Sequence, residues 1–184
     1  VAGWRGTVFI VDDNFIGNKR KLKEDTLPAL IEWSKEKKYP FFFITEVSIN
    51  LADDEELIKL MVEAGFNSIF VGIETPNIES LVECGKMQNL KRDLVESVNK
   101  LQRSGMLVSG GFIVGFDNDT ENVFDEQINF IQKSGITSAM VGLLNAPTGT
   151  KLYQRLKDEG RLLEMWTGNN MDASINFVPK MEFK

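Results

Sequence analysis

The sequence predicts an α/β fold in which parallel strands form one sheet and helices cover it. Five short, nearly continuous apolar runs alternate with longer amphipathic segments. The runs start about 27 to 40 residues apart, which is the spacing of strands joined by helical crossovers. Continuous apolar runs are typical of strands that are buried on both faces. Such a sheet is either open or closed into a barrel, and periodicity does not distinguish the two.

The apolar runs are the predicted strands, and each is followed by a helical pattern. The strands are expected over Thr7–Val11, Phe41–Val47, Ser68–Ile73, Leu107–Val114 and Ser138–Leu144. The helices are expected over Lys19–Lys38, between Asp53 and Gly65, and over Asn77–Cys84, Leu90–Ser104, Thr120–Ser134 and Thr150–Glu159.

Three local signals refine the helices. Asp53 with Glu56 three residues later reads as a capping box, and Gly65 reads as the stop of that helix. Pro28 interrupts the first helical pattern, so it marks either a kink or a helix start.

Composition removes several classes of function. The net charge is −6 without a dense basic cluster, so a nucleic-acid partner is not expected. No uninterrupted apolar stretch reaches the ~18 residues of a membrane helix. There is no histidine, which excludes Ser-His-Asp and Cys-His catalysis within this chain. One cysteine, Cys84, permits no internal disulfide and fits a reducing compartment such as the cytoplasm.

The chain begins at Val1 and carries no signal-peptide pattern, so we expect an excised segment of a longer protein. Residues 1–163 are predicted to form a partial barrel. Periodicity fades after Leu163, and residues 164–184 are predicted to form an extension or the start of another domain.

Polar side chains follow the predicted strands, where parallel α/β folds place their sites. Asp12, Glu46, Glu74 and Asp117 are therefore expected at one shared rim. Asp12 or Asp13 could instead satisfy only turn amides, and Asp119 or Thr120 is favoured as a helix cap over a ligand. Glu46 and Glu74 end apolar strands, where an unpaired carboxylate is costly, so a functional role is favoured for both.

The glycines within the fourth predicted strand allow two interpretations. Gly110 to Gly115 is not a phosphate loop, because no Lys-Ser or Lys-Thr pair follows. Glycine inside a strand indicates close approach of another group. Either a flat adenine lies against the backbone there, or the barrel packs tightly at that place.

These motifs, taken in order, resemble one family. Residues 8–15 (Val-Phe-Ile-Val-Asp-Asp-Asn-Phe) and Phe70-Val71-Gly72-Ile73-Glu74-Thr75 are similar to the second- and fourth-strand motifs of radical S-adenosylmethionine (radical SAM) proteins that carry a cobalamin-binding domain. Residues 111–115 (Gly-Phe-Ile-Val-Gly) and 145–150 (Asn-Ala-Pro-Thr-Gly-Thr) resemble the fifth- and sixth-strand motifs. The subgroup that includes hopanoid-methylase-like proteins resembles the chain most.

The resemblance implies a partial TIM-like (βα)₆ barrel that contains strands two to six and lacks the first βα unit. It implies a parent enzyme in which S-adenosylmethionine, bound to a [4Fe–4S] cluster, yields a 5′-deoxyadenosyl radical. Cobalamin is a possible further cofactor and methyl transfer a possible outcome. The substrate would be a small molecule or a lipid.

The resemblance also implies roles for particular residues. Asp12 and Asp13 would lie by the methionine amino group, while Glu46, Ser48 and Glu74 would face the methionine and ribose. The adenine would be lined by Gly111, Ile113 and Gly115, and Leu143 to Pro147 would border the adenine or the substrate.

The chain departs from the family in one respect. It lacks the Cys-x-x-x-Cys-x-x-Cys loop that binds the cluster in the family. Cys84 cannot replace three thiolates and is expected to be a buried or half-buried structural residue. The fragment alone is therefore expected to be inactive. Its exposed edge at Thr7–Val11 is a possible site of dimer pairing.

Two alternatives remain open at this point. Glu46 and Glu74 could serve a different barrel enzyme as an acid/base pair or a Mg²⁺ site. The chain could also be a non-catalytic module that keeps the fold alone.

Overall fold

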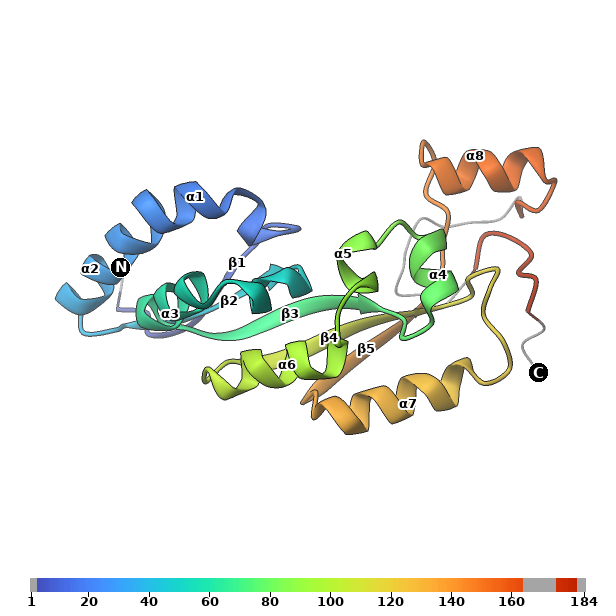
Figure 1. Cartoon of the computed structure of the whole chain (residues 1–184). Helices are drawn as coiled ribbons and strands as arrows, with labels where there is room; N and C mark the ends of the chain where they lie inside the picture. The colour runs from blue at the N-terminus through green and yellow to red at the C-terminus, as the bar shows by residue number, and fades with distance from the viewer. Residues whose placement is uncertain (1–2, 164–174, 182–184) are drawn as a thin grey trace.

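The computed structural model describes residues 3–163 and 175–181, and its centre is one parallel five-stranded sheet (Figure 1). The strands follow chain order, β1-β2-β3-β4-β5, and every neighbouring pair is parallel. Their bounds are β1 Gly6–Ile10, β2 Phe41–Val47, β3 Phe66–Glu74, β4 Leu107–Val114 and β5 Ser138–Leu143. The prediction of five parallel strands is confirmed, with β2 and β4 at the expected bounds.

Helices connect the strands, as a parallel sheet requires. Their bounds are α1 Lys19–Lys21, α2 Leu27–Glu36, α3 Glu55–Ala64, α4 Ile78–Glu83, α5 Met87–Leu90, α6 Leu94–Arg103, α7 Val123–Ser134 and α8 Lys151–Asp158. Short 3₁₀ segments at Phe15–Asn18 and Ile49–Asp53 follow β1 and β2.

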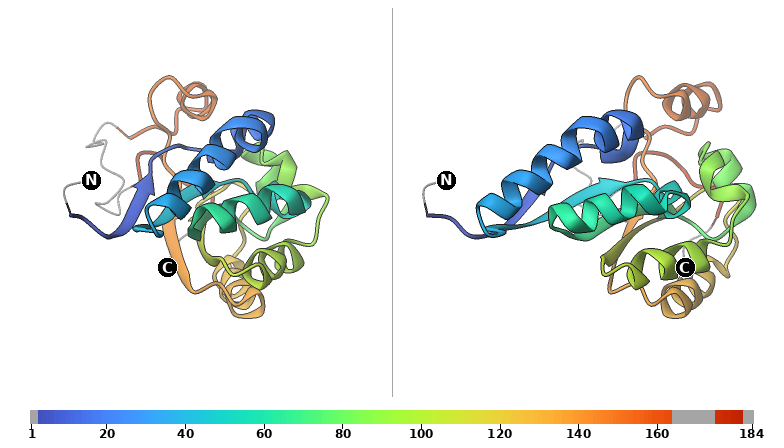
Figure 2. Two further views of the ribbon diagram at one scale, coloured as in Figure 1. Left: turned by 90° about the vertical axis from the view of Figure 1, so that its left-hand side faces the viewer. Right: turned by 60° about the vertical axis from the view of Figure 1, so that its left-hand side comes forward.

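The sheet curls into part of a barrel with the helices on its convex side. Seen nearly along the strands, β1 and β5 bend toward one another, while α2, α3, α6 and α7 lie outside (Figure 2). This arrangement confirms the predicted partial barrel. It also separates an outer, helix-covered face of the sheet from an inner, concave one.

The hydrophobic core fills the space between the outer face and the helices. Alternate residues of the central strands, among them Val71 and Val108, are fully buried there. Leu57, Met61 and Leu101 pack against them from α3 and α6. The residues between them in sequence, including Glu46 and Gly111, face the concave side and are only partly covered. The outer face of the sheet is therefore buried under the helices, and the concave face is open for a functional site.

The starts of α2 and α3 test two of the local predictions. The helix predicted over Lys19–Lys38 runs from α1 through a π turn at Leu22–Thr26 into α2, with Pro28 in the first turn of α2. The helix is continuous at this place, since the Leu27 amide bonds to the Leu22 carbonyl, and Pro28, which has no amide to donate, directly follows the π turn. Asp54, not Asp53, caps α3, and it accepts a 3.1 Å hydrogen bond from the Leu57 amide. The predicted capping box is wrong, since Glu56 pairs with Lys23 instead.

The last helix lies apart from the others. α8 lies beyond the carboxyl ends of the strands (Figure 1) and packs in a small cluster of Ala146, Leu156 and Phe177. The domain boundary predicted after residue 163 stays a prediction, and residues 164–174 and 182–184 lie outside the described part of the chain. Within the described residues, no helix is long and apolar enough to cross a membrane.

Candidate functional site

A cleft of about 390 Å³ opens on the concave side of the sheet, toward the carboxyl ends of β2 and β3. Six of the predicted site residues line it, from four different segments of the chain: Asp13, Glu46, Ser48, Glu74, Gly111 and Ile113. Parallel strands end on the same side of a sheet, so residues distant in sequence meet there. The structure thus brings most of the predicted site together.

The end of β3 has an unusual backbone. The register with β4 shifts between Gly72 and Glu74, and Glu74 has φ of +66°, in the left-handed region. A residue with a side chain adopts this conformation at a cost in free energy, and the surrounding contacts must hold it. This turn places the Glu74 carboxylate in the cleft, where the side chain is 14% exposed.

Lys86 neutralises Glu74 inside the cleft. Its Nζ lies 2.7 Å from Glu74 Oε1. The pair lies directly over Gly72, where an added Cβ would come within 2.6 Å of Oε1 and 3.2 Å of the lysine Nζ. Position 72 therefore needs glycine for this ion pair to lie where it does.

Glu46 has a different environment from Glu74. It lines the same cleft from β2, but among the described residues its carboxylate makes no hydrogen bond or ion pair. A partly covered carboxylate without a partner favours binding of a cation or a hydrogen-bond donor. The cleft thus offers one neutralised carboxylate, Glu74, and two that have no partner among the described residues, Glu46 and Asp13.

Ser48 is held by its neighbours rather than free. Its backbone amide donates a 3.0 Å hydrogen bond to Asn14 Oδ1, and its hydroxyl lies 2.7 Å from Asn50 Oδ1. Asn14 thereby ties the turn after β1 to the end of β2. The contact brings Asp13, which follows β1, to the edge of the cleft.

Two glycines of β4 lie against side chains on opposite faces of the sheet. An added Cβ at Gly111 would lie 2.8 Å from the Phe70 ring, on the concave side. An added Cβ at Gly110 would meet Phe112 and Ile136 on the core side. Tight packing therefore accounts for both glycines in this structure, and the adenine contact at Gly111 stays a prediction.

Three predicted site residues do not line the cleft. Asp12 accepts a 3.0 Å hydrogen bond from the Asn14 amide, as expected of a turn residue. Gly115 has φ of +115° and donates its amide to the buried Asp119 carboxylate. Leu143 lies on β5 and is 37% exposed, next to Gly142, which does line the cleft.

Asp117, predicted at the same rim, belongs to a separate ion-pair network. Its carboxylate, 7% exposed, lies 2.7 Å from Arg155 Nη1, 2.7 Å from Arg161 Nη2 and 3.3 Å from Lys180 Nζ. Glu83 accepts from the Asp117 amide and from Arg155. The network fastens the loop after β4 to α4, α8 and the segment 175–181.

The electrostatics of Asp117 follow from these contacts. Burial works to raise the pKa of the carboxyl, but hydrogen bonds from Arg161, Lys180 and Arg155 outweigh it and lower the pKa to about 2. The same contacts raise the pKa of Arg161. Every charge of the network is matched, which indicates a structural role.

Two further expectations are corrected. Neither Asp119 nor Thr120 is the cap of α7, which begins at Val123 after Asn122. The buried Asp119 carboxylate accepts from the Gly115 and Phe116 amides and from Ser80 Oγ. Cys84 is exposed, not buried or half-buried, and its thiol lies 3.5 Å from the Leu81 carbonyl oxygen.

Sequence reasoning did not identify several residues that line the cleft. Lys86 and Gln88 come from the α4–α5 connection, Phe70 and Met140 from strands, and Asn14 from the turn after β1. The strand residues could have been found by alternation, two positions before Gly72 and Gly142. Lys86 could not, because nothing in sequence indicates that the connection folds back over β3.

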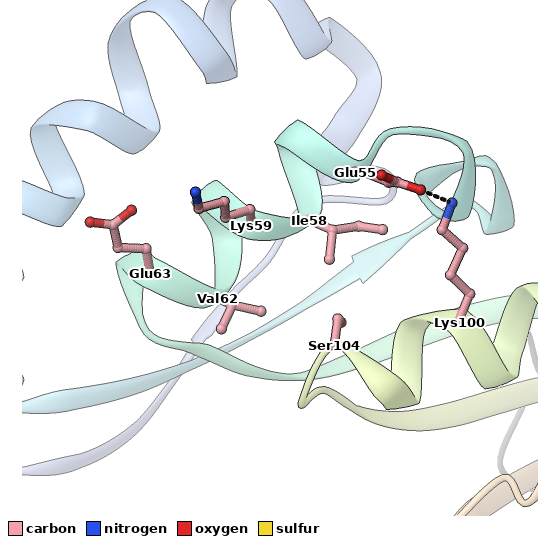
Figure 3. A pocket seen from close by; sticks show the side chains of 7 residues that line it. All are labelled: Glu55, Ile58, Lys59, Val62, Glu63, Lys100 and Ser104. Atoms are coloured by element: carbon pink, nitrogen blue, oxygen red, sulfur yellow. Dashed lines mark ion pairs between the residues drawn. The ribbon is translucent and has the colours of Figure 1, made fainter.

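A larger hollow, of about 720 Å³, lies on the outer surface between α3 and α6 (Figure 3). Ile58 and Val62 line it on one side and Ser104 on the other, and a Glu55–Lys100 ion pair of 2.9 Å crosses one end. It lies between helices on the convex side of the sheet and contains no predicted site residue. The smaller concave cleft is therefore the better candidate site.

Comparison with protein families gives two matches. Residues 7–131 match the model described as "Radical SAM superfamily", which covers β1 to the last turn of α7. Residues 150–184 match a model described as "Domain of unknown function (DUF4070)".

Curated relatives extend over nearly the whole chain. It is 46% identical over 178 residues to "Uncharacterized methyltransferase sll1242" of Synechocystis sp., covering 96% of this chain and 33% of the relative. It is 39% identical over 177 residues to "Hopanoid C-2 methylase" of Rhodopseudomonas palustris, with the same coverage. The chain thus spans about a third of the length of these relatives.

Among solved structures, the fold is similar to that of the radical S-adenosylmethionine methyltransferase TsrM from Kitasatospora setae. The TM-score is 0.64 at 16% identity, over 74% of this chain and 27% of the other. That structure contains cobalamin and a [4Fe–4S] cluster, and a second one contains tryptophan substrate and a SAM analogue.

Proposed function

The chain belongs to the radical SAM superfamily, and from that premise we propose that it forms the S-adenosylmethionine-binding part of a methyltransferase. The observation that carries the proposal is the concave cleft, where Glu46 and Glu74 meet at the ends of β2 and β3. The similarity to hopanoid C-2 methylase and to TsrM supports methyl transfer as the outcome.

The charges of the cleft suit the proposed ligand. S-adenosylmethionine carries a positive sulfonium and a positive ammonium group, and both favour carboxylates in a sheltered site. Lys86 already neutralises Glu74, whereas Glu46 has no partner among the described residues. We propose that Glu46 accepts a hydrogen bond from the ammonium group or the ribose, and that Glu74 offers its second oxygen to the same ligand.

The other proposed ligand contacts come from residues that end or follow successive strands. Asp13 and Ser48 would border the methionine, and Gly111 with Ile113 would flank the adenine. Asp12 would contribute through its backbone, since its side chain holds the turn. Gly115 and Leu143 lie farther from the cleft lining and are proposed to shape its wall.

The chain's own residues do not fit the iron–sulfur cluster. Such a cluster requires three cysteine thiolates beside the bound S-adenosylmethionine, and Cys84 is the one cysteine of the sequence and does not line the cleft. Thiolates from outside this chain would have to hold the cluster. When bound to it, S-adenosylmethionine supplies a 5′-deoxyadenosyl radical or a methyl group, as in the superfamily.

Cobalamin and the substrate are proposed from the relatives. TsrM contains cobalamin, so we propose it as a second cofactor of the parent protein. A small molecule or a lipid is the proposed substrate, because the relatives named above include a hopanoid methylase and a protein with bound tryptophan. Cytoplasmic location and edge-strand dimerisation stay predictions.

A nuclear magnetic resonance titration tests the site directly. We expect S-adenosylmethionine to shift the amide signals of the cleft lining, with weak affinity, because the ligand's bonds to iron are missing. S-adenosylhomocysteine, which lacks the sulfonium charge, should bind more weakly still. Signal changes confined to the α3–α6 hollow would contradict the proposal, and so would submicromolar binding that Glu46→Gln leaves unchanged.

A further inference from the structure

A short segment near the end of the described chain, residues 175–181, contacts the loops that follow β4 and β5 (red in Figure 1). It pairs with residues 161–163 through the antiparallel Leu162–Phe177 bridge and through main-chain hydrogen bonds. We call residues 175–181 the C-terminal strap. The strap lies within residues 150–184, the part of the chain that matches the second family model.

Asn176 of the strap holds the chain after β5 by both ends of its side-chain amide. Its Oδ1 accepts a hydrogen bond from the Ala146 amide at 2.9 Å, and its Nδ2 donates to the Ala146 carbonyl at 2.8 Å. Two residues that face each other as a hydrogen-bonded pair of antiparallel strands exchange the same two bonds. The Asn176 side chain, 2% exposed, therefore takes the place of a neighbouring strand.

The chain after β5 needs such a partner, because β5 is an edge of the described sheet. The Leu144 amide still donates to the Val114 carbonyl at 2.8 Å, which continues the pairing with β4. Ala146 comes two residues later and is fully buried. A buried amide and a buried carbonyl that lose their partners cost free energy. The position of the Ala146 backbone therefore depends on Asn176.

The strap also contacts the residues that are proposed to border the adenine. A Cβ added at Gly115 would lie 3.4 Å from Leu144 Cβ and 3.8 Å from Ile175 Cδ1, so these three residues lie together. Ile175 and Leu144 both pack in the small cluster around Ala146. The strap thus touches the loop after β4 and residues 143–147, which are the two parts of the proposed adenine wall.

We propose that Asn176 is a positioning residue, which fixes the Ala146 backbone so that the chain after β5 borders the adenosine half of the ligand. Both ends of its amide are engaged by Ala146 and its side chain is buried, so it acts through that backbone. The inference rests on the proposed function, because the ligand is taken to be S-adenosylmethionine. Its geometric part, that Asn176 holds Ala146, is independent of any ligand.

The first experiment titrates the chain with S-adenosylmethionine and with its two halves, read by magnetic resonance. The halves are 5′-methylthioadenosine and S-methylmethionine, which keeps the sulfonium and ammonium charges. Asn176→Ala removes both hydrogen bonds, and Asn176→Asp keeps the shape and the acceptor but loses the donor. Val178→Ala is the matched control, since Val178 is a strap residue whose side chain is exposed.

We expect both Asn176 variants to weaken binding of 5′-methylthioadenosine and of S-adenosylmethionine on the order of fivefold. Binding of S-methylmethionine should stay unchanged, and Val178→Ala should match the wild type for every probe. Equal weakening of both halves would mean that the whole cleft loosens, and the positioning role would be overturned. Wild-type affinity for S-adenosylmethionine in Asn176→Ala would overturn it as well.

A second measurement, amide hydrogen exchange, needs no ligand and separates this inference from the proposed function. The Ala146 amide should exchange about tenfold faster in Asn176→Ala, while the Leu144 amide, bonded to β4, serves as the unchanged reference. Val178→Ala should change neither. Unchanged exchange at Ala146 defeats the inference even where the wild-type chain binds every probe. Absence of binding to the wild-type chain, with the expected exchange, defeats the proposed function and leaves Asn176 as the support of Ala146.

Discussion

Two groups of carboxylates lie near the carboxyl ends of the strands, and their surroundings differ sharply. Asp117 and Glu83 accept from three cations and from backbone amides, and Asp117 is almost fully buried. Glu46 and Glu74 line an open cleft, in which Lys86 pairs with Glu74. Both groups look alike in sequence, as acids that follow apolar strands or helices. Their partners show that the first group stabilises the fold, while the second is left available for a ligand.

Replacement of Asp117, the central acid of the first group, should show the largest difference in stability between the two groups. We expect Asp117→Ala to lower the free energy of unfolding by about 3 kcal/mol, because Arg155, Arg161 and Lys180 would face one another without their shared anion. Urea unfolding monitored by circular dichroism measures the loss. Glu74→Ala is the matched comparison, with an expected loss below about 1 kcal/mol. Equal losses would remove the distinction between the two groups.

The pH dependence should separate the groups in the acid range. The pKa of Asp117 is lowered from 3.8 to about 2, so its stabilising effect is complete above pH 3.8 and is lost as pH falls through 2. The effect corresponds to about 2 kcal/mol. We expect the stability difference between wild type and Asp117→Asn to shrink by this amount from pH 5 to below 2. A pH-independent difference would contradict the assigned cause.

Glycine substitutions test how tightly the cleft wall is packed. Gly111→Ala should cost about 1 to 2 kcal/mol, because the new methyl group would lie 2.8 Å from the Phe70 ring. Gly142→Ala, in the same wall, meets no atom within 4 Å and should be nearly neutral. Thermal unfolding of the two variants gives the comparison. A neutral Gly111→Ala would show that Phe70 moves aside freely.

The smallest effect is expected at Glu46. Glu46→Gln should change the free energy of unfolding by less than about 0.5 kcal/mol, because no described residue pairs with the carboxylate. The same variant should weaken S-adenosylmethionine binding measurably. A large loss of stability would reveal a structural partner and would move Glu46 into the same group as Asp117.

The sequence predicted the strands well because their apolar runs are nearly continuous and helical patterns separate them. It also predicted that Glu46 and Glu74 share a site, because parallel strands end on one side. It failed where tertiary contacts decide: Asp117 was expected at the rim because its arginine partners lie about 40 residues away. Lys86 was missed for the same reason, since its contact with Glu74 depends on how a connection folds back.

The position of Glu74 in the strand order has a consequence for hydrogen exchange. It ends β3, the middle strand, which has a paired neighbour on each side. β5 is exposed along all six residues, and β1 has one described neighbour. Local opening should therefore begin at the two edges, and the amides of β3 should exchange last. The proposed binding carboxylate would then belong to the slowest-exchanging unit of the chain, so it would keep its place while the rims of the sheet fluctuate.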